Sequence, residues 1–238
     1  MSDQVTTLTF FRYPKFFQRA WAFTMMQFAQ GPLNRTEDLV FYRLLGTGKG
    51  ETFNPRPEWS VYGLLQVWPN EATAEKFLST HPLMARYRRV ASEAWTIFMT
   101  CQKAHGEWAR ANPFEEQGES ANPDAPVAAI TRATIRLKSL PKFWKYVPTS
   151  QAPLANAEGL VYKIGIGEVP IAQMATFSIW ESTRALKAYA YQSPEHMEAI
   201  RKTRELGWYK EELFSRFTPY RSEGSWGGRD FGELLKGA

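Results

Sequence analysis

The sequence predicts an α+β protein in which two ferredoxin-like units, fused in one chain, form an α/β barrel of the dimeric kind. Three observations lead to this prediction: an internal repeat, the order of elements within each repeat, and a high aromatic content. The 238 residues correspond to roughly one or two domains. Nine Trp, ten Tyr and sixteen Phe are enough to build a sizeable core, to line a site for an apolar ligand, or both.

The two halves of the chain repeat one another. Trp68 and Trp95 match Trp180 and Trp208 at offsets of 112 and 113 residues. Three further matches keep the same order: residues 39–42 with 160–163, residues 14–16 with 141–143, and residues 106–108 with 224–226. Self-similarity of this kind indicates that one supersecondary unit occurs twice.

Each half predicts the order strand, helix, strand, strand, helix, strand, which is that of the ferredoxin-like unit. Residues 5–13 are rich in Thr, Val and Phe, as strands are, and the helix after them stops at Gly31-Pro32. The elements expected in the first half are strands at 5–13, 38–46, 60–68 and 96–102, and helices at 15–30 and at 71–95, the latter broken at His81-Pro82.

The second half predicts the same elements in the same order. They are strands at 127–137, 160–169, 174–180 and 213–220, a short helix from Pro141, and a broken helix at 182–210. Helices would cover one face of each sheet, so the two remaining apolar faces can be buried together. We expect an N-terminal unit at 1–111, a polar, proline-containing linker at 112–126 and a C-terminal unit at 127–238. The residues discussed below as candidates for binding a cofactor all lie in the C-terminal unit.

Charge and cysteine content exclude several classes of protein. The net charge is +5 without any run of five Lys or Arg, so we expect no nucleic-acid partner. One cysteine excludes an internal disulfide and a Cys-cluster metal site, and three histidines leave little room for a His-rich one. No apolar stretch of about 20 residues and no secretory signal is visible, so we expect a cytoplasmic protein.

His196 is the sharpest candidate for a ligand. One helical face carries Leu83, Tyr87, Val90 and Ala94 in the first repeat and His196, Ile200, Thr203 and Gly207 in the second. A histidine in place of a core leucine, beside side chains that are smaller than their counterparts in the first repeat, suits a planar cofactor with a protein ligand. Its place near a helix start disfavours imidazolium and favours the neutral, metal-binding form. A buried histidine satisfied by a hydrogen bond is the more common explanation of such a pattern, and both interpretations stay open.

Other candidates have simpler explanations. We expect His81 to be a cap or loop residue at the helix break, His105 to be exposed, and Cys101 to be an inert thiol in a strand. The glycines at 46–50 and at 165–167 are expected to be bends or close backbone approaches at strand ends. They do not form a phosphate loop, because the GxxxxGK[ST] pattern is missing.

Basic side chains of the second half form a further candidate group. Arg132 shares a strand face with Ile130, Lys163 lies on the neighbouring strand, and Arg204 flanks the helical face of His196. They are either ordinary surface charges or partners of a carboxylate ligand such as the propionates of a haem, since arginine pairs well with carboxylates.

Six segments carry more specific motifs. They are TRATIR (131–136), KIGIGEVP (163–170), TFSIW (176–180) and EAIRKTRELGWYKEELFSRF (198–217), with WAF (21–23) and EAWTIFM (93–99) in the first half. These segments resemble the spheroidene monooxygenase family of acyclic carotenoid 2-ketolases. The resemblance implies haem b, with its iron, as cofactor, and a reaction in which dioxygen and external electrons oxidise a methylene group of a linear carotenoid.

The resemblance also bears on the site. The family's PHxEAIR-like stretch corresponds to residues 195–201, with Glu195 in place of the proline, and implies that His196 is the axial haem ligand. It implies an apolar, carotenoid-like substrate, dioxygen, and an electron donor such as ferredoxin. A membrane-dissolved substrate suggests peripheral contact with a bilayer, which a net charge of +5 would help. An exposed barrel edge is compatible with a homodimer.

Two other classes of function fit the predicted fold. One is a haem enzyme of another reaction type, a peroxidase or a dehydratase. The other is a barrel that binds a haem or an apolar ligand without catalysis. Fold alone does not decide among them, because function depends on the site.

Overall fold

The computed structural model describes residues 2–235 except for 51–52, 121, 152–153, 155–156, 193–200 and 202–204. The first half contains β1 (Val5–Arg12), α1 (Phe16–Phe28), α2 (Gln30–Asn34), β2 (Phe41–Gly48), β3 (Pro57–Trp68), α3 (Glu71–Thr80), α4 (Pro82–Val90) and β4 (Glu93–Gly106). The second half contains β5 (Val127–Ile135), η1 (Leu137–Ser139), α5 (Leu140–Gln151), β6 (Leu160–Val169), β7 (Gln173–Trp180), α6 (Thr183–Gln192), β8 (Tyr209–Gly224) and α8 (Gly232–Leu235).

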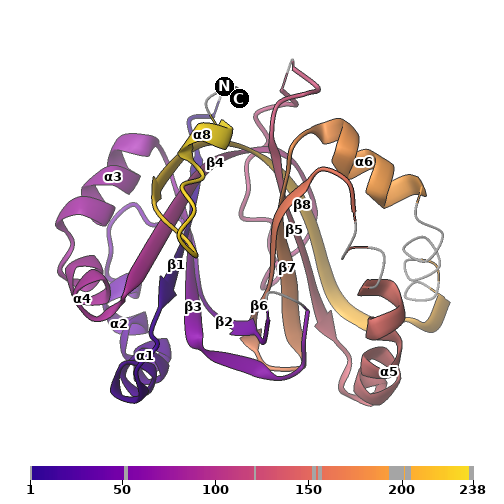
Figure 1. Ribbon diagram of the computed structural model, residues 1–238, viewed down its shortest axis with the longest axis horizontal. Coiled ribbons are helices and arrows are strands. Elements are labelled where there is room, and N and C mark those ends of the chain that lie inside the picture. Colours follow the sequence, from indigo (N-terminus) through magenta and orange to yellow (C-terminus); the bar gives the residue numbers. More distant parts are fainter. Residues whose placement is uncertain are drawn as a thin grey trace.

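The strands close into one barrel in the order β1-β3-β2-β6-β7-β5-β8-β4. Each half supplies a four-stranded antiparallel sheet, β4-β1-β3-β2 or β6-β7-β5-β8. The helices α1 to α4 lie outside the first sheet, and α5 and α6 lie outside the second (Figure 1). The predicted barrel of two ferredoxin-like units is therefore confirmed.

Two unequal seams join the half sheets. Along one, β4 and β8 pair from Trp95↔Gly224 to Gly106↔Leu213. Along the other, β2 and β6 pair only at Gly46↔Gly167 and Thr47↔Ile166. The glycine-containing strand ends predicted as bends or close approaches thus meet at the shorter seam. A Cβ on Gly167 would lie 2.6 Å from the carbonyl oxygen of Gln173, so only glycine fits there.

Large aromatic side chains fill the interior of the barrel. The rings of Phe10 and Trp95 lie 5.8 Å apart, and Tyr162 meets Trp95 edge-on at 5.0 Å. Phe177 and Trp226 complete the packing around Phe10. Side chains that occupy the interior of a small barrel make it a core rather than a channel. A ligand site is therefore to be sought on the outside of the sheets or at the barrel ends.

The predicted end of the helix at 71–95 is wrong. The helix ends at Val90, and Ala94 lies on β4 instead of on a helical stripe. Ala91 has extended backbone, the amide of Ser92 donates to the carbonyl of Arg12, and Glu93 pairs with Arg12. Pairing with β1 therefore overrides the local apolar period.

The predicted start of the last strand is also wrong. It was predicted at 213, after a helix to 210, but β8 begins at Tyr209, which pairs with Ile135. The side chain of Glu211 is thereby placed on a strand rather than at a helix end. The strand extends because the end of β5 offers it backbone partners, a contact that local sequence does not display.

Candidate functional site

The outward face of the second half sheet is built from small side chains in its middle. The strand register aligns Gly165, Thr176 and Thr131 in one row across β6, β7 and β5, and Lys163, Ser178 and Ala129 in the next. These six residues are called the C-terminal floor. Alternation along β5 places Ala128 and Ile130 in the barrel core, so the intervening Ala129 and Thr131 face outward. Thr131 is exposed.

The first half sheet carries much larger side chains on its outward face. Leu64 occupies the position of Thr176, at an offset of 112 residues, and Leu44 occupies the position of Gly165, at an offset of 121. Leu44 and Leu64 pair across β2 and β3 and pack in one cluster with the helices. The second half therefore has smaller side chains at these two positions.

Two small apolar clusters flank the C-terminal floor. One, formed by Ile135, Phe143, Val147 and Trp208, lies at the α5 end of the sheet. The other joins Val127, Leu154 and Trp180 and packs against α6. Between them, the described side chains of the floor are glycine, alanine, serine, threonine and one lysine. Apolar clusters therefore lie on both sides of these small and polar side chains.

Of the predicted site residues, Lys163 lies on this face. Its Nζ donates to the carbonyl oxygen of Leu154 at 3.4 Å. His196 and Arg204 lie outside the described residues. Arg132 shares the inward face with Ile130, as predicted, and therefore lies on the other side of the sheet from Lys163. The structure does not bring Arg132 and Lys163 together.

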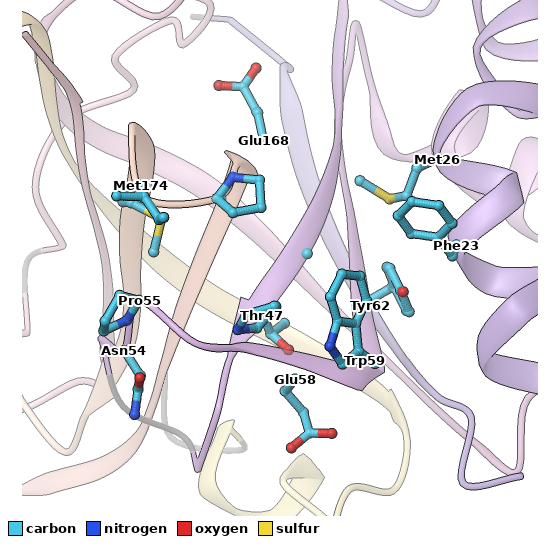
Figure 2. Close-up of a pocket in the computed structure, with 15 residues that line it drawn as sticks. Phe23, Met26, Thr47, Asn54, Pro55, Glu58, Trp59, Tyr62, Glu168 and Met174 are labelled. Carbon is cyan, nitrogen blue, oxygen red and sulfur yellow. The ribbon is translucent and has the colours of Figure 1, made fainter. Parts of the chain in front are cut away.

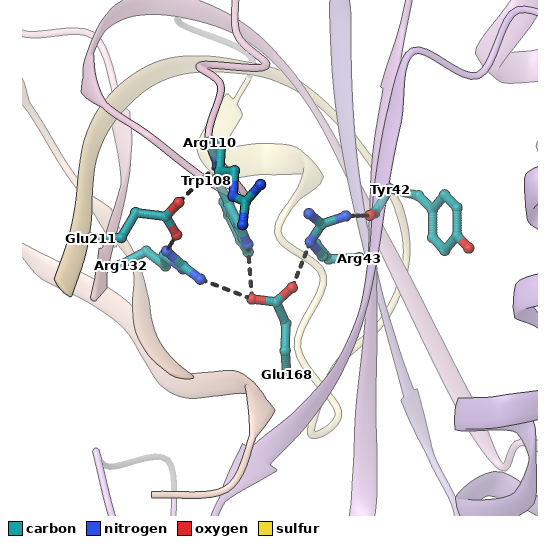
Figure 3. Close-up of polar contacts among 7 residues, drawn as sticks. All are labelled: Tyr42, Arg43, Trp108, Arg110, Arg132, Glu168 and Glu211. Atoms are coloured by element: carbon teal, nitrogen blue, oxygen red, sulfur yellow. Dashed lines mark hydrogen bonds and ion pairs between the residues drawn. The ribbon is translucent and has the colours of Figure 1, made fainter. Parts of the chain in front are cut away.

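Arg132 belongs to a buried group of ion pairs within the barrel (Figure 3). Its guanidinium, with a side chain only 4% exposed, contacts Glu211 and lies 3.3 Å from Glu168. Glu168 also pairs with Arg43 at 2.5 Å and accepts from the indole of Trp108 at 2.9 Å. The Arg43–Glu168 pair crosses from β2 to β6, where the backbone ladder is shortest. The group therefore reinforces this seam.

The ionisation of Glu211 fits this role. Burial by itself would raise its pKa, but hydrogen bonds from the Arg110 amide and the Arg132 guanidinium outweigh that effect and lower it. Sequence analysis missed Glu168 and Glu211 as partners of Arg132. The sequence did contain a signal for Glu168. Every second residue of β6, Ile164 and then Ile166, faces the interior, and Glu168 is the next in that series.

The three remaining candidates have structural roles. His81 caps α4, its Nδ1 accepting from the amide of Leu83 at 3.2 Å, as predicted. His105 is exposed, as predicted, but it lies within β4 rather than after a strand. Cys101 is buried in β4, and burial raises the pKa of its thiol to about 12, so it is inert. Among the described residues, no group of three or more His, Cys, Asp or Glu could hold a metal ion.

An apolar pocket of about 180 Å³ lies beside the short seam. Figure 2 shows Phe23 and Met26 of α1 on one side of it and Met174 of β7 on the other, with Trp59 and Tyr62 between them. Gly46 and Gly167 form part of its wall. Met174 precedes Thr176 by two residues on the outward face of β7, so the pocket adjoins the C-terminal floor.

Comparison with known proteins gives a consistent set of relatives. No family model matches the chain. A spheroidene monooxygenase of Rhodobacter capsulatus is 37% identical over 227 residues, which cover 95% of this chain and 94% of the relative. A spheroidene monooxygenase of Cereibacter sphaeroides is 35% identical over 98% of this chain and 72% of the relative.

Among solved structures, an aldoxime dehydratase superposes with a TM-score of 0.61 at 12% identity over 91% of this chain and 81% of the other. A second, in complex with butyraldoxime, superposes with a TM-score of 0.59 at 11% identity over 98% and 84%. At such identities the likeness shows a shared fold. No helix in the described part of the chain is long and apolar enough to cross a membrane.

Proposed function

Because the chain belongs to the spheroidene monooxygenase family, we propose that it is a haem-dependent monooxygenase that ketolates an acyclic carotenoid or a similar apolar substrate. The observation that supports a cofactor site is the C-terminal floor. Residues of large volume in the first half are replaced there by Gly165 and Thr176, beside walls of apolar side chains. A flat, apolar macrocycle suits this surface.

The residues present fit a haem in charge as well as in shape. Lys163, on the floor, would pair with a propionate, as would Arg204. Arg132 already pairs with two carboxylates inside the barrel, so the proposed set for this face does not use it. His196 would bind the haem iron, with its neutral imidazole favoured near a helix start. Cys101 is unsuited to this role, because its thiol is buried in β4.

Bound haem would supply the activation of dioxygen with two external electrons per hydroxylation, and two hydroxylations at one methylene give a gem-diol that loses water to a ketone. The chain itself would bind and orient the substrate. The pocket beside the short seam, lined by Phe23, Trp59 and Met174, would hold one end of the apolar chain. Its apolar walls exclude water from that end. An electron donor such as ferredoxin, a homodimer and peripheral membrane contact belong to the same proposal.

The first test is the visible spectrum of protein expressed with a haem supply, beside His196→Ala. A Soret band that is lost or shifted in this variant would support both the haem and its ligand. His105→Ala is the matched control, because His105 is exposed on β4, and its spectrum should equal that of the parent. The absence of a Soret band in the parent would overturn the haem proposal. A band that is unchanged in His196→Ala would show that another residue binds the haem iron.

The second test separates the monooxygenase from the other classes of haem protein. With an acyclic carotenoid, ketone formation should require both dioxygen and a reductant. Turnover with hydrogen peroxide alone would indicate a peroxidase, and water loss from an aldoxime would indicate a dehydratase. Tight haem binding without any of these reactions would indicate a binding protein and would overturn the catalytic part of the proposal.

A further inference from the structure

The helix α1 is apolar on both of its faces. Ala22 and Met25 on its inner face are buried against the first half sheet. Its outer face carries phenylalanines whose exposed fractions are 84% for Phe17, 76% for Phe16 and 69% for Phe28. A surface helix normally carries polar side chains outward, so apolar residues on both faces indicate that the outer face is covered in the functional state.

Most other exposed apolar side chains lie at the same end of the barrel. This end, called the α1 end, comprises α1, the β2–β3 and β6–β7 connections, and the start of α5, which lie along the lower edge of Figure 1. The apolar pocket is lined by Pro55 of the first connection and by Ile171 of the second, and the pair Thr134↔Gln173 places the second connection beside the end of β5. Of eleven exposed large apolar side chains among the described residues, nine belong to it or adjoin it: Phe16, Phe17, Phe23, Phe28, Trp59, Leu137, Val169, Ile171 and Leu206.

The α1 end is also basic and free of acidic residues over two long stretches. Residues 14–36 and 133–157 together contain seven Lys or Arg and no Asp or Glu, although the whole chain nets only +5. The β2–β3 connection adds Lys49, Glu51 and Arg56, and Glu58 and Glu168 line the pocket beside it. The seven cations are Lys15, Arg19, Arg35, Arg136, Lys138, Lys142 and Lys145. Within the described part of the structure, no salt bridge involves any of the seven.

Aromatic side chains beside cations that form no salt bridge in the described part of the chain match the surface of an anionic bilayer. Phenylalanine and tryptophan enter the interfacial region, while lysine and arginine meet the lipid phosphates. A charge-complementary protein partner would have to be acidic and to offer an apolar groove as well. An anionic bilayer offers both the negative charge and the apolar interior at one surface.

The apolar pocket opens on this same surface. The exposed rings of Phe23 and Trp59 lie 5.7 Å apart and line the pocket together with Ile171. Met174 on the far wall adjoins the C-terminal floor, as described above. A hydrocarbon chain that leaves a bilayer at the α1 end therefore meets the pocket first and the floor next.

We propose that the α1 end docks on an anionic lipid bilayer, with Phe16, Phe17 and Phe28 in the interface and the pocket open to the lipid. The biological purpose rests on the proposed function, because only an apolar, membrane-dissolved substrate needs this route. The physical test needs neither haem nor substrate, so the two proposals fail separately.

The test is flotation of the full-length protein with vesicles of phosphatidylcholine alone or mixed with phosphatidylglycerol. The parent should float with the anionic vesicles and much less with the neutral ones. The triple variant Phe16→Gln, Phe17→Gln, Phe28→Gln should lose at least tenfold in binding, with its melting temperature unchanged, because these rings are largely exposed. Val40→Gln is the matched control: Val40 is 56% exposed, lies next to the other end of β2 and should bind like the parent.

A second variant tests the cationic part of the surface. Lys142→Glu with Lys145→Glu on α5 should weaken binding to anionic vesicles and leave the weak binding to neutral ones unchanged. If the triple phenylalanine variant floats with anionic vesicles as well as the parent does, the proposal is overturned. It is also overturned if the parent does not bind anionic vesicles. If the triple variant instead converts a dimer to a monomer in sedimentation while the parent binds no lipid, the α1 end is an interface between copies of the chain, which also overturns it.

Discussion

The two half sheets share one topology but cover their outward faces in opposite ways. In the first half, a single apolar cluster runs from β1 to the helices, with Phe11 stacked on Tyr87 at 4.8 Å. In the second half, two small clusters leave the C-terminal floor between them. Among the described residues, the first copy has the larger outward packing, which stabilises the barrel, and the second copy has the surface that we propose for the ligand.

The largest expected effect is in the first half. Phe11→Ala removes a ring that is 1% exposed, and it should lower the free energy of unfolding by about 4 kcal/mol in urea denaturation. Thr131→Ala, on the floor of the second half, should cost well under 1 kcal/mol, because Thr131 is exposed. Equal losses at the two positions would show that both halves carry the fold alike.

A smaller loss is expected where the two halves meet. Glu168→Ala leaves the buried Arg132 and the indole of Trp108 without their shared carboxylate, and should cost about 3 kcal/mol of unfolding free energy. Glu119→Ala is the control, because Glu119 pairs with Arg216 but is 52% exposed, and its loss should stay well under 1 kcal/mol. A Glu168→Ala variant as stable as the parent would show that these ion pairs do not stabilise the short seam.

The pH dependence of stability sharpens the account of the same seam. The pKa of Glu211 is lowered in the fold, so its contribution is complete above the unfolded value of 4.5 and is lost as the pH falls through the folded value. Parent and Glu211→Gln should differ by about 2 kcal/mol at pH 7, a typical value for a charged hydrogen bond. Chemical denaturation from pH 7 to pH 3 should show this gap closing, and a constant gap would contradict the assignment.

The smallest expected change is in the free energy of haem binding, and it tests the C-terminal floor most directly. Thr176→Leu restores the side chain that the first half carries at Leu64, and should weaken haem binding at least tenfold, or by about 1.4 kcal/mol. Haem titration followed at the Soret band measures it, with thermal unfolding to show that the fold persists. The reciprocal Leu64→Thr should lower stability and leave haem binding intact. Unchanged haem affinity in Thr176→Leu would place the cofactor away from the floor.

Much of the fold could be predicted because its signals are local or periodic. The repeated tryptophans, the alternation in the strands and the glycines at 46 and 167 indicated the duplicated unit and its strand ends. His81 was recognisable as a helix cap because capping depends on neighbouring residues. The ends of α4 and the start of β8 were missed, since pairing with β1 and β5 decides them.

Residue identity and spacing along the chain were enough to predict the duplication, the barrel class and the inert Cys101, and to assign the chain to its family. Three-dimensional packing was needed to show that Arg132 and Lys163 lie on opposite faces of one sheet, and that Glu168 and Glu211 pair with Arg132. It also decided which face of α1 stays exposed. Both faces of α1 are apolar in sequence, and only the sheet that covers one of them distinguishes the two.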